Sequence, residues 1–279
     1  IKCNQIKEFS NNELLKGKCI TEISICGTIT ATLQIPIKSN PNKVTYFITL
    51  EDETGTIDAF YFDKQRKKFD KLLQVNNQVI IITGGAGGIG SDCAKEFAKC
   101  GAKVAIVDFN EELGNKVVNE IKDFGGTAKL YLTNILNSNE VNNCVEEVIR
   151  DFGNVDILIN LAGGSARKNR HFFYEQSDEV FQNIIGVNLF GTFYFCRKCA
   201  QYMIKAKHGK IINTSSVVGL EGHVMHSEYA ASKGGVVSMS KSMAKELGKF
   251  GINVNCVCPG MIPTQNATNG NLNHTNYLH

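Results

Sequence analysis

Two side chains with the chemistry for proton transfer, Tyr229 and Lys233, stand four residues apart. On a helix, residues at this spacing share a face. Tyrosine is ordinarily a poor base because its pKa is about 10, and a neighbouring ammonium group favours the phenolate. A tyrosine and a lysine at this spacing are more often part of a solvated helix face. The interpretation therefore depends on what else the chain brings to them.

One further side chain, Ser216, belongs with this pair by its position. It follows the strand-like segment KIINT at 210–214 and stands thirteen residues before Tyr229. Ligands of open α/β sheets bind outside the carboxyl ends of the strands. We therefore expect Ser216 in a loop at that edge, in one site with Tyr229 and Lys233.

A glycine-rich turn within VIIITGGAGGIG, residues 79–90, indicates a phosphate-binding site. The apolar run 79–82 predicts a buried strand, and the apolar spacing over 91–100 predicts a helix. A tight turn, close approach of a cofactor backbone and close helix–strand packing are the roles we expect for Gly84, Gly88 and Gly90. The helix N-terminus would offer free N–H groups and a positive dipole end to a pyrophosphate. An ordinary glycine loop is the alternative.

A second strand-like segment, KVAIVD at 103–108, favours the dinucleotide interpretation. Asp108 stands 24 residues after Gly84, where a carboxylate is expected to bind the hydroxyls of the adenosine ribose. Neither the glycine turn nor Phe109 supplies a basic side chain to offset repulsion of a 2′-phosphate. The sequence therefore predicts NAD(H) as the cofactor rather than NADP(H).

The elements that would position these residues alternate between strand and helix from residue 79 onward. Such alternation predicts an α/β fold, a doubly wound parallel Rossmann sheet. We expect helices over 111–124, 138–151, 178–206 and 229–250, and strands over 128–132, 155–160, 210–214 and 252–257. The dinucleotide-binding domain would span 78–264. The polar, Asn-rich segment 265–279 is expected to be a disordered tail.

Residues 1–77 have a different character. Alternating apolar residues predict strands over 20–30, 44–50 and 56–62, with a turn at 51–55 and a helix over 63–73. The string FITLEDETGTIDAFYF resembles the oligonucleotide/oligosaccharide-binding (OB) fold of modules attached to bacterial replicative polymerases. Because 79–82 is assigned to the dinucleotide fold, this small β-rich, OB-like domain would be incomplete.

The amino-acid composition limits which binding partners and which cellular compartment can be expected. Net charge is +3 and no apolar run has the length of a bilayer span, so neither nucleic acid nor a membrane is indicated. Ten scattered cysteines favour reduced thiols and a cytoplasmic protein. The first residue is Ile1, so an organellar targeting segment stays open. The pairs Cys196/Cys199 and Cys256/Cys258 are interpreted as core or surface thiols, and no metal site is expected.

The chemistry-bearing residues together resemble the short-chain dehydrogenase/reductase family. The matching motifs occur in the family order: Thr83-Gly84-x-x-x-Gly88-x-Gly90, Asn160-Leu161-Ala162-Gly163, Asn188, Ser216, Tyr229-x-x-x-Lys233 and Pro259-Gly260-x-x-x-Thr264. The resemblance implies hydride transfer between NAD(H) and a small alcohol or carbonyl substrate. Resemblance to 3-oxoacyl-carrier-protein reductases and to sugar-alcohol dehydrogenases is about equal, so the substrate stays open.

The resemblance also implies roles. Tyr229 would exchange a proton with the substrate oxygen, and Lys233 would hold the nicotinamide ribose and lower the pKa of Tyr229. Ser216 would hydrogen-bond the substrate oxygen, and Asn188 would anchor a water that links Lys233 to solvent. The cofactor would contact Thr83, Gly84, Gly88, Ile89, Gly90, Asp108, Phe109, Asn134, Ile135, Asn160, Ala162, Gly163, Tyr229, Lys233, Pro259, Gly260 and Thr264.

Three departures from the family pattern stand out. Asn134 replaces a common aspartate near the adenine, and Leu161 replaces an asparagine. Past Thr264 the family normally continues with a substrate-covering lobe and a last strand, which this sequence does not show. We therefore expect cofactor binding to exceed turnover, and 252–257 to form an unprotected sheet edge.

Two other functions and an assembly state follow from the sequence. Residues 18–77 could bind single-stranded nucleic acid through Tyr46, Phe47, Phe60, Tyr61 and Phe62 with Lys64, Arg66, Lys67 and Lys68, although core aromatics and a solvated helix explain them better. A catalytically impaired cofactor-binding scaffold is the second. Pairing of helices 178–206 and 229–250 between subunits predicts a homodimer, on apolar positions Ile184, Val187, Phe195, Val236, Met239 and Met243.

Overall fold

The computed structural model describes residues 28–37, 40–52, 55–62, 77–166 and 169–260. The chain divides into two compact units, Ile1–Gln74 and Val75–His279. Each unit is described by itself.

The first unit contains a three-stranded antiparallel sheet in the order β1-β2-β3. Its strands are β1 (Thr28–Ile37), β2 (Asn40–Asp52) and β3 (Gly55–Phe62). The strands predicted over 44–50 and 56–62 are confirmed as parts of β2 and β3. The strand predicted over 20–30 overlaps β1 only at its end, because 20–27 lie outside the described residues. The predicted helix over 63–73 also lies outside them.

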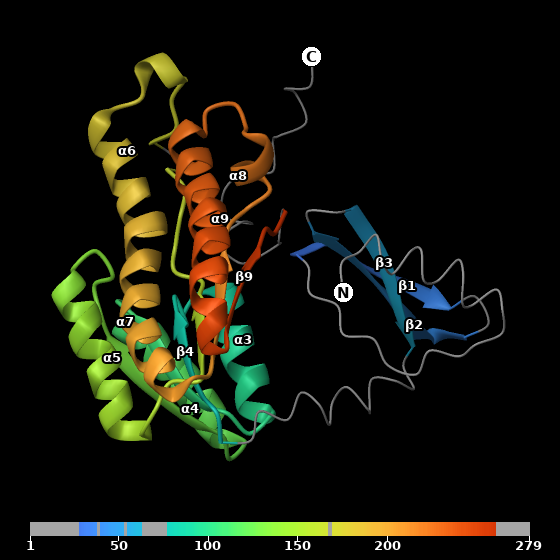
Figure 1. The fold of residues 1–279 in the computed structure, drawn as a ribbon, viewed down its shortest axis with the longest axis vertical. Coiled ribbons are helices and arrows are strands. Elements are labelled where there is room, and N and C mark those ends of the chain that lie inside the picture. The colour runs from blue at the N-terminus through green and yellow to red at the C-terminus, as the bar shows by residue number, and fades with distance from the viewer. Residues whose placement is uncertain (1–27, 38–39, 53–54, 63–76, 167–168, 261–279) are drawn as a thin grey trace. The chain divides into compact units, whose positions relative to one another are not determined.

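The second unit is built on a six-stranded parallel sheet in the order β6-β5-β4-β7-β8-β9 (Figure 1). The chain runs outward from β4 to β6, returns to β7 beside β4, and then runs outward again to β9. The chain order reverses between β4 and β7, and doubly wound sheets bind ligands outside the carboxyl ends of the strands at such a reversal. The strands are β4 (Val79–Thr83), β5 (Lys103–Asp108), β6 (Thr127–Leu132), β7 (Ile157–Asn160), β8 (Gly209–Thr214) and β9 (Ile252–Val257).

Helices cover both faces of this sheet, as the doubly wound prediction requires. Side chains alternate along β4, so that Ile80 and Ile82 pack in one apolar cluster and Val79 and Ile81 in another. The first cluster includes residues of α3 (Gly88–Lys99) and α4 (Glu111–Asp123). The second includes residues of α5 (Ser138–Phe152), α7 (Gly191–Ala206) and α9 (Ser227–Leu247). The core therefore lies in two layers, one on each face of the sheet.

Local side-chain bonds explain where several helices begin. Asn110 Oδ1 accepts from the Leu113 N–H at 3.0 Å before α4, and Asn137 Oδ1 accepts from the Asn139 N–H at 3.0 Å before α5. Ser177 Oγ accepts from the Val180 N–H at 3.3 Å before α6 (Asp178–Ile185). Such caps satisfy backbone N–H groups that have no partner within the helix.

The long helix predicted over 178–206 is not a single α-helix. A π-helical turn, Gly186–Phe190, separates α6 from α7. A π turn inserts one extra residue and leaves no mark in apolar periodicity, which is why the pattern missed it. Short elements complete the unit: α8 (Val218–Glu221) and 3₁₀ turns at Phe173–Glu175 and Gly248–Phe250.

The apolar residues chosen from sequence for a subunit contact are partly wrong. Ile184, Phe195 and Val236 are 6%, 1% and 0% exposed, so they pack inside this unit. The exposed phenylalanines of the predicted helix 178–206 are instead Phe181, Phe190 and Phe193, at 38%, 50% and 40%. Helical periodicity finds the buried face first, and here that face is internal.

Candidate functional site

The residues predicted to bind or react gather at the carboxyl edge of the sheet. Each parallel strand delivers one segment there, because all six point the same way. The strand ends are Thr83 of β4, Asp108 of β5, Asn160 of β7, Thr214 of β8 and Val257 of β9, and Ser216 follows Thr214 by two residues.

The glycine turn after β4 is packed too tightly for side chains. Gly84 has a φ of +65°, and a Cβ on it would lie 2.8 Å from the Cα of Ala162. A Cβ on Gly90 would collide with the carbonyl oxygen of Gly84. Gly88 and Ile89 are exposed, so the start of α3 is accessible. The N–H groups of Gly85, Ala86 and Gly87 are bonded within the protein, so the exposed start of α3 is the part of this segment that can offer backbone N–H groups to a ligand.

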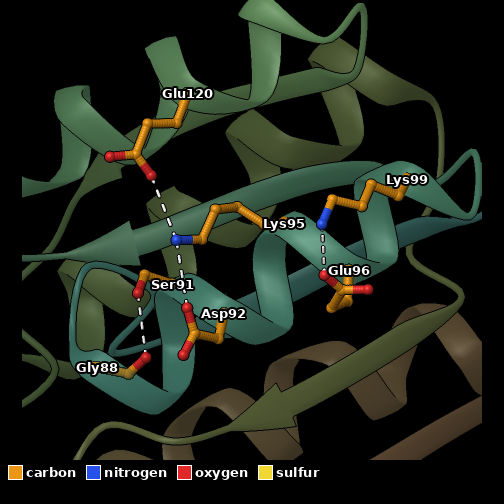
Figure 2. Close-up of polar contacts among 7 residues, drawn as sticks. All are labelled: Gly88, Ser91, Asp92, Lys95, Glu96, Lys99 and Glu120. Carbon is orange, nitrogen blue, oxygen red and sulfur yellow. Dashed lines mark hydrogen bonds and ion pairs between the residues drawn. The ribbon is translucent and has the colours of Figure 1, made fainter. Parts of the chain in front are cut away.

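Polar contacts fix α3 behind this turn (Figure 2). Ser91 Oγ donates to the Gly88 carbonyl at 3.1 Å, and Lys95 Nζ bridges Asp92 at 3.2 Å and Glu120 of α4 at 3.3 Å. The Lys95 ammonium is therefore neutralised by two carboxylates. It supplies little free positive charge for an extra phosphate.

Asp108 is held against the glycine turn. Its Oδ2 accepts from the Ala86 N–H and its Oδ1 from the Asn110 N–H, both at 3.0 Å. The next residue, Phe109, is 84% exposed. The carboxylate is thus oriented where the turn and the end of β5 meet.

Asn134 and Ile135 lie in the loop after β6. Asn134 Oδ1 accepts from the Leu136 N–H at 3.1 Å, and the Asn134 N–H donates to Glu140 at 2.9 Å. Ile135 packs against the core beside Gly191. A Cβ added to Gly191 would lie 2.8 Å from Ile135 Cδ1. The side-chain oxygen of Asn134 is therefore partly used within its own loop.

A chain of buried hydrogen bonds crosses the sheet beneath the site. Asn160 Nδ2 donates to Asn213 Oδ1, and Asn213 Nδ2 donates to Ser240 Oγ of α9, both at 2.8 Å. Thr83 Oγ1 donates to Asn160 Oδ1 at 3.4 Å and accepts from the Ala162 N–H at 3.2 Å. The sequence analysis did not name Asn213 or Ser240. An amide inside a strand predicted to be buried was the available signal, because such a group needs a partner.

Asn188 lies within the π turn and is fully buried. Its Oδ1 accepts from the Gly164 N–H at 2.9 Å, and its Nδ2 donates to the Gly164 carbonyl at 2.8 Å and to Ser232 Oγ at 3.0 Å. A Cβ on Gly163 would lie 2.5 Å from Asn188 Oδ1 and 3.3 Å from Lys233 Nζ. The structure therefore brings Asn188, Gly163 and Lys233 together.

Ser216, Tyr229 and Lys233 meet at the start of α9. Burial raises the pKa of Tyr229, and the Ser216 hydroxyl opposes that rise by a smaller amount. Lys233 is 5% exposed and donates from Nζ to the Thr214 carbonyl at 2.7 Å, with Nζ 5.8 Å from the centre of the Tyr229 ring. Burial lowers the pKa of Lys233 to about 8. The unit thus holds a phenol, a hydroxyl and a titratable ammonium in one place.

The segment after β9 closes over the Ser216 loop. The Pro259 carbonyl accepts from the Val217 N–H at 3.1 Å, which places Pro259 and Gly260 beside that loop. Thr264 lies outside the described residues.

Sequence reasoning also missed His226, the residue before α9. Its ring centre lies 6.4 Å from that of Tyr229, and burial lowers its pKa. A histidine in a loop of no fixed spacing gives no signal in sequence.

Within the described ranges, no cluster of three or more His, Cys, Asp or Glu could hold a metal ion. The described helices include none that is both long and apolar enough to cross a membrane.

Known proteins are similar to this chain in sequence. The model of the short chain dehydrogenase family matches residues 78–275. The 3-oxoacyl-(acyl-carrier-protein) reductase FabG of Thermotoga maritima is 36% identical over 192 residues, which cover 69% of this chain and 77% of that protein. Secoisolariciresinol dehydrogenase of Forsythia intermedia is 37% identical over 192 residues, covering 68% of each chain.

Solved structures show the same fold. The crystal structure of gox2181 matches with a TM-score of 0.69 at 31% identity, over 72% of this chain and 78% of that one. NAD⁺-bound xylitol dehydrogenase matches with a TM-score of 0.64 at 30% identity, over 67% and 72%. The family match begins at residue 78, so it gives no support to the OB-like resemblance of the first unit. The domain limits at 77 and 264 and the tail 265–279 stay predictions. Through its second unit, this chain belongs to the short-chain dehydrogenase family.

Proposed function

We propose that the second unit is an NAD(H)-dependent oxidoreductase that interconverts an alcohol and a carbonyl compound. The observation that carries this proposal is the meeting of Ser216, Tyr229 and Lys233 at the same sheet edge as the glycine turn. Proton transfer needs the tyrosine, and binding of a dinucleotide needs the turn. Small alcohols or ketones of the 3-oxoacyl or sugar-alcohol kind are the proposed substrates, since relatives with both kinds of name are similar to this chain.

The residues present fit a dinucleotide. Backbone N–H groups at Gly84, Gly88, Ile89 and Gly90 would meet the pyrophosphate, Asp108 the adenosine ribose, and Lys233 the nicotinamide ribose. The remaining proposed contacts are Thr83, Phe109, Asn134, Ile135, Asn160, Ala162, Gly163, Tyr229, Pro259, Gly260 and Thr264. When bound, the nicotinamide ring supplies the hydride acceptor or donor for the reaction.

Three side chains would handle the proton and the substrate oxygen. Ser216 donates a hydrogen bond to that oxygen, and Tyr229 takes a proton from it or gives one to it. Burial alone would keep Tyr229 protonated, and the nearby Lys233 ammonium and Ser216 hydroxyl oppose that effect. Asn188 would position the loop at Gly164 and a water beyond Lys233.

The first test removes the proposed proton-transfer group. We expect Tyr229→Phe to lower kcat by about 10²- to 10⁴-fold, because general acid–base catalysis contributes on that order. NADH affinity, measured by fluorescence titration, should stay within about threefold, since the phenol hydroxyl is lost and the cofactor contacts remain. Tyr202→Phe on α7, whose ring lies beside Lys198 and Lys205, is the matched control. Near-normal turnover of Tyr229→Phe would refute its role.

The second test concerns the choice of cofactor, for which we propose NAD(H). The Asp108 carboxylate faces the glycine turn and should repel a 2′-phosphate. Asp108→Ala should raise the ratio of NADP⁺ to NAD⁺ catalytic efficiency by about tenfold, or about 1.4 kcal/mol. Asp123→Ala, at the exposed end of α4, is the control. Equal affinity of the unaltered protein for both cofactors would rule this proposal out.

The third test uses pH. The Lys233 ammonium is present below its pKa of about 8 and is lost as pH rises through that value. If the ammonium holds the nicotinamide ribose, NADH affinity should fall as pH is raised from 7 to 9. Lys233→Met should bind weakly at every pH and show no such step. Lys249→Met, an exposed lysine beyond α9, should keep it. Superimposable pH curves for the unaltered protein and Lys233→Met would contradict this role.

The fourth test concerns assembly. We propose a homodimer formed through the face over α7 and α9, where a groove is lined by Leu189, Phe190, Phe193, Tyr194, Gly235 and Met239. Its exposed aromatics are Phe190 and Phe193. Sedimentation at micromolar concentration should show a dimer that Phe193→Glu dissociates and Phe124→Glu, on the opposite layer, does not. A monomer alone in the unaltered protein would exclude the proposal.

Neither a nucleic-acid-binding protein nor a scaffold is favoured by any described contact.

A further inference from the structure

Two histidines in the loop between α8 and α9 direct ring nitrogens at one backbone oxygen. His223 Nδ1 lies 3.0 Å from the carbonyl oxygen of Val224, and His226 Nδ1 lies 2.8 Å from the same oxygen. The two Nδ1 atoms are 3.2 Å apart. The rings meet edge to face, with their centres 4.8 Å apart. Two ring nitrogens and an oxygen therefore converge on one small space.

Protons alone do not satisfy these three atoms well. A ring nitrogen of neutral imidazole either carries a hydrogen or presents a lone pair. If both Nδ1 atoms carry a hydrogen, two N–H groups point side by side at the Val224 oxygen and repel each other. If only one does, its hydrogen is shared between that oxygen and the other Nδ1. A cation bound to all three lone pairs removes the conflict.

The separations of the three atoms match one face of a metal coordination shell. Ligand atoms bound at right angles, with metal–ligand bonds of about 2.1 Å, lie about 3.0 Å apart, and tetrahedral ligands lie about 3.4 Å apart. The observed 2.8, 3.0 and 3.2 Å are grouped around the first value. Imidazole nitrogen is a preferred ligand of zinc, copper and nickel. The three atoms therefore fit an octahedral site with three further positions open to solvent.

The backbone of this loop is held in an unusual conformation at Met225. Its φ is +59°, in the left-handed region that side chains other than glycine seldom adopt. Strain of this kind recurs at ligand-binding turns. His223 is exposed and His226 is half-buried, so an ion can reach both from solvent. The Ala230 N–H donates to the His226 carbonyl at 2.7 Å, which ties the loop to the first turn of α9.

Two charged groups from outside the loop act on His226, and their signs are opposite. They are the Arg170 guanidinium, in the loop after β7, and the Glu228 carboxylate, in α9. Glu228 is 0% exposed, and its Oε1 has no hydrogen-bond partner among the described residues. A buried carboxylate with an unpartnered oxygen favours positive charge nearby. It offsets the repulsion of a cation by Arg170.

We propose that His223 Nδ1, His226 Nδ1 and the Val224 carbonyl oxygen bind one divalent transition-metal ion of the zinc type. The sequence analysis expected no metal site because it weighed only the cysteine pairs. With two side-chain ligands, this site also differs from a cluster of three or more. The ion would order the loop that leads into α9, where the His226 ring centre is 6.4 Å from that of Tyr229. Binding of the ion does not depend on the function proposed above.

The first experiment is calorimetric titration of the untagged, cofactor-free full chain with Zn²⁺. His223→Ala and His226→Ala should each weaken one Zn²⁺ site by about tenfold or more, since loss of a mere outer-shell partner already costs about 10- to 100-fold. His171→Ala, an exposed histidine in the loop after β7, is the matched control and should keep the site. Mg²⁺ should not bind there, because it requires oxygen ligands. Zn²⁺ binding that both variants retain in full would belong to other groups, such as thiols, and would overturn the proposal.

The second experiment locates the ion in the unaltered chain, so it does not depend on the folding of a variant. Diethyl pyrocarbonate modifies the ring nitrogen that carries no hydrogen. When Nδ1 binds Zn²⁺, the hydrogen stays on Nε2 and neither nitrogen reacts. At a Zn²⁺ concentration of about ten times Kd, modification of His223 and His226 should slow about tenfold, because only the free fraction reacts. Peptide mass mapping should show no change at His171. Unprotected His223 and His226 would overturn the proposal.

Discussion

The buried ammonium group of Lys233 imposes the constraint on which the site depends. A charged group that is 5% exposed must find hydrogen-bond acceptors, or its burial costs several kcal/mol. The Thr214 carbonyl supplies one at the end of β8, and Ser215 Oγ donates to the carbonyl of Lys233 itself at 2.7 Å. Space around the side chain is limited, because a Cβ on Gly219 would lie 2.8 Å from the Cβ of Lys233. One side chain therefore fixes α9 against the sheet edge and requires a glycine beside it.

The π turn also helps to hold α9 at the sheet edge, through Asn188. It places Asn188 so that one amide bonds both backbone groups of Gly164 and the Ser232 hydroxyl. A regular α-helix would rotate the following residues of α7 by about 100° relative to this arrangement. The irregular turn thus joins the loop after β7 to α9. A local departure from regular geometry is acceptable there because each buried polar atom of Asn188 is satisfied.

Sequence patterns predicted the strands and helices well where the apolar residues recur at a regular spacing. Apolar and polar residues alternate over 252–256, and β9 has the predicted limits 252–257; the predicted starts of α4 and α5 are also correct. Glycine spacing and the four-residue step from Tyr229 to Lys233 indicated the site, because both are local. The π turn, the partner of Asn213 and the internal burial of Phe195 were missed. Each of these depends on residues far apart in sequence, which periodicity does not report.

The lone pairs of the Asp108 carboxylate set how many hydrogen-bond donors it can still accept from. A carboxylate has about four acceptor positions, and the Ala86 and Asn110 N–H groups occupy two. The number left matches a vicinal diol, which brings two O–H donors. The orientation of the carboxylate is fixed when the chain folds, so a diol that binds there does not have to immobilise it. A sugar lacking one hydroxyl would leave one acceptor position to water. The end of β5 would therefore distinguish ligands by their number of hydroxyl donors as well as by their charge.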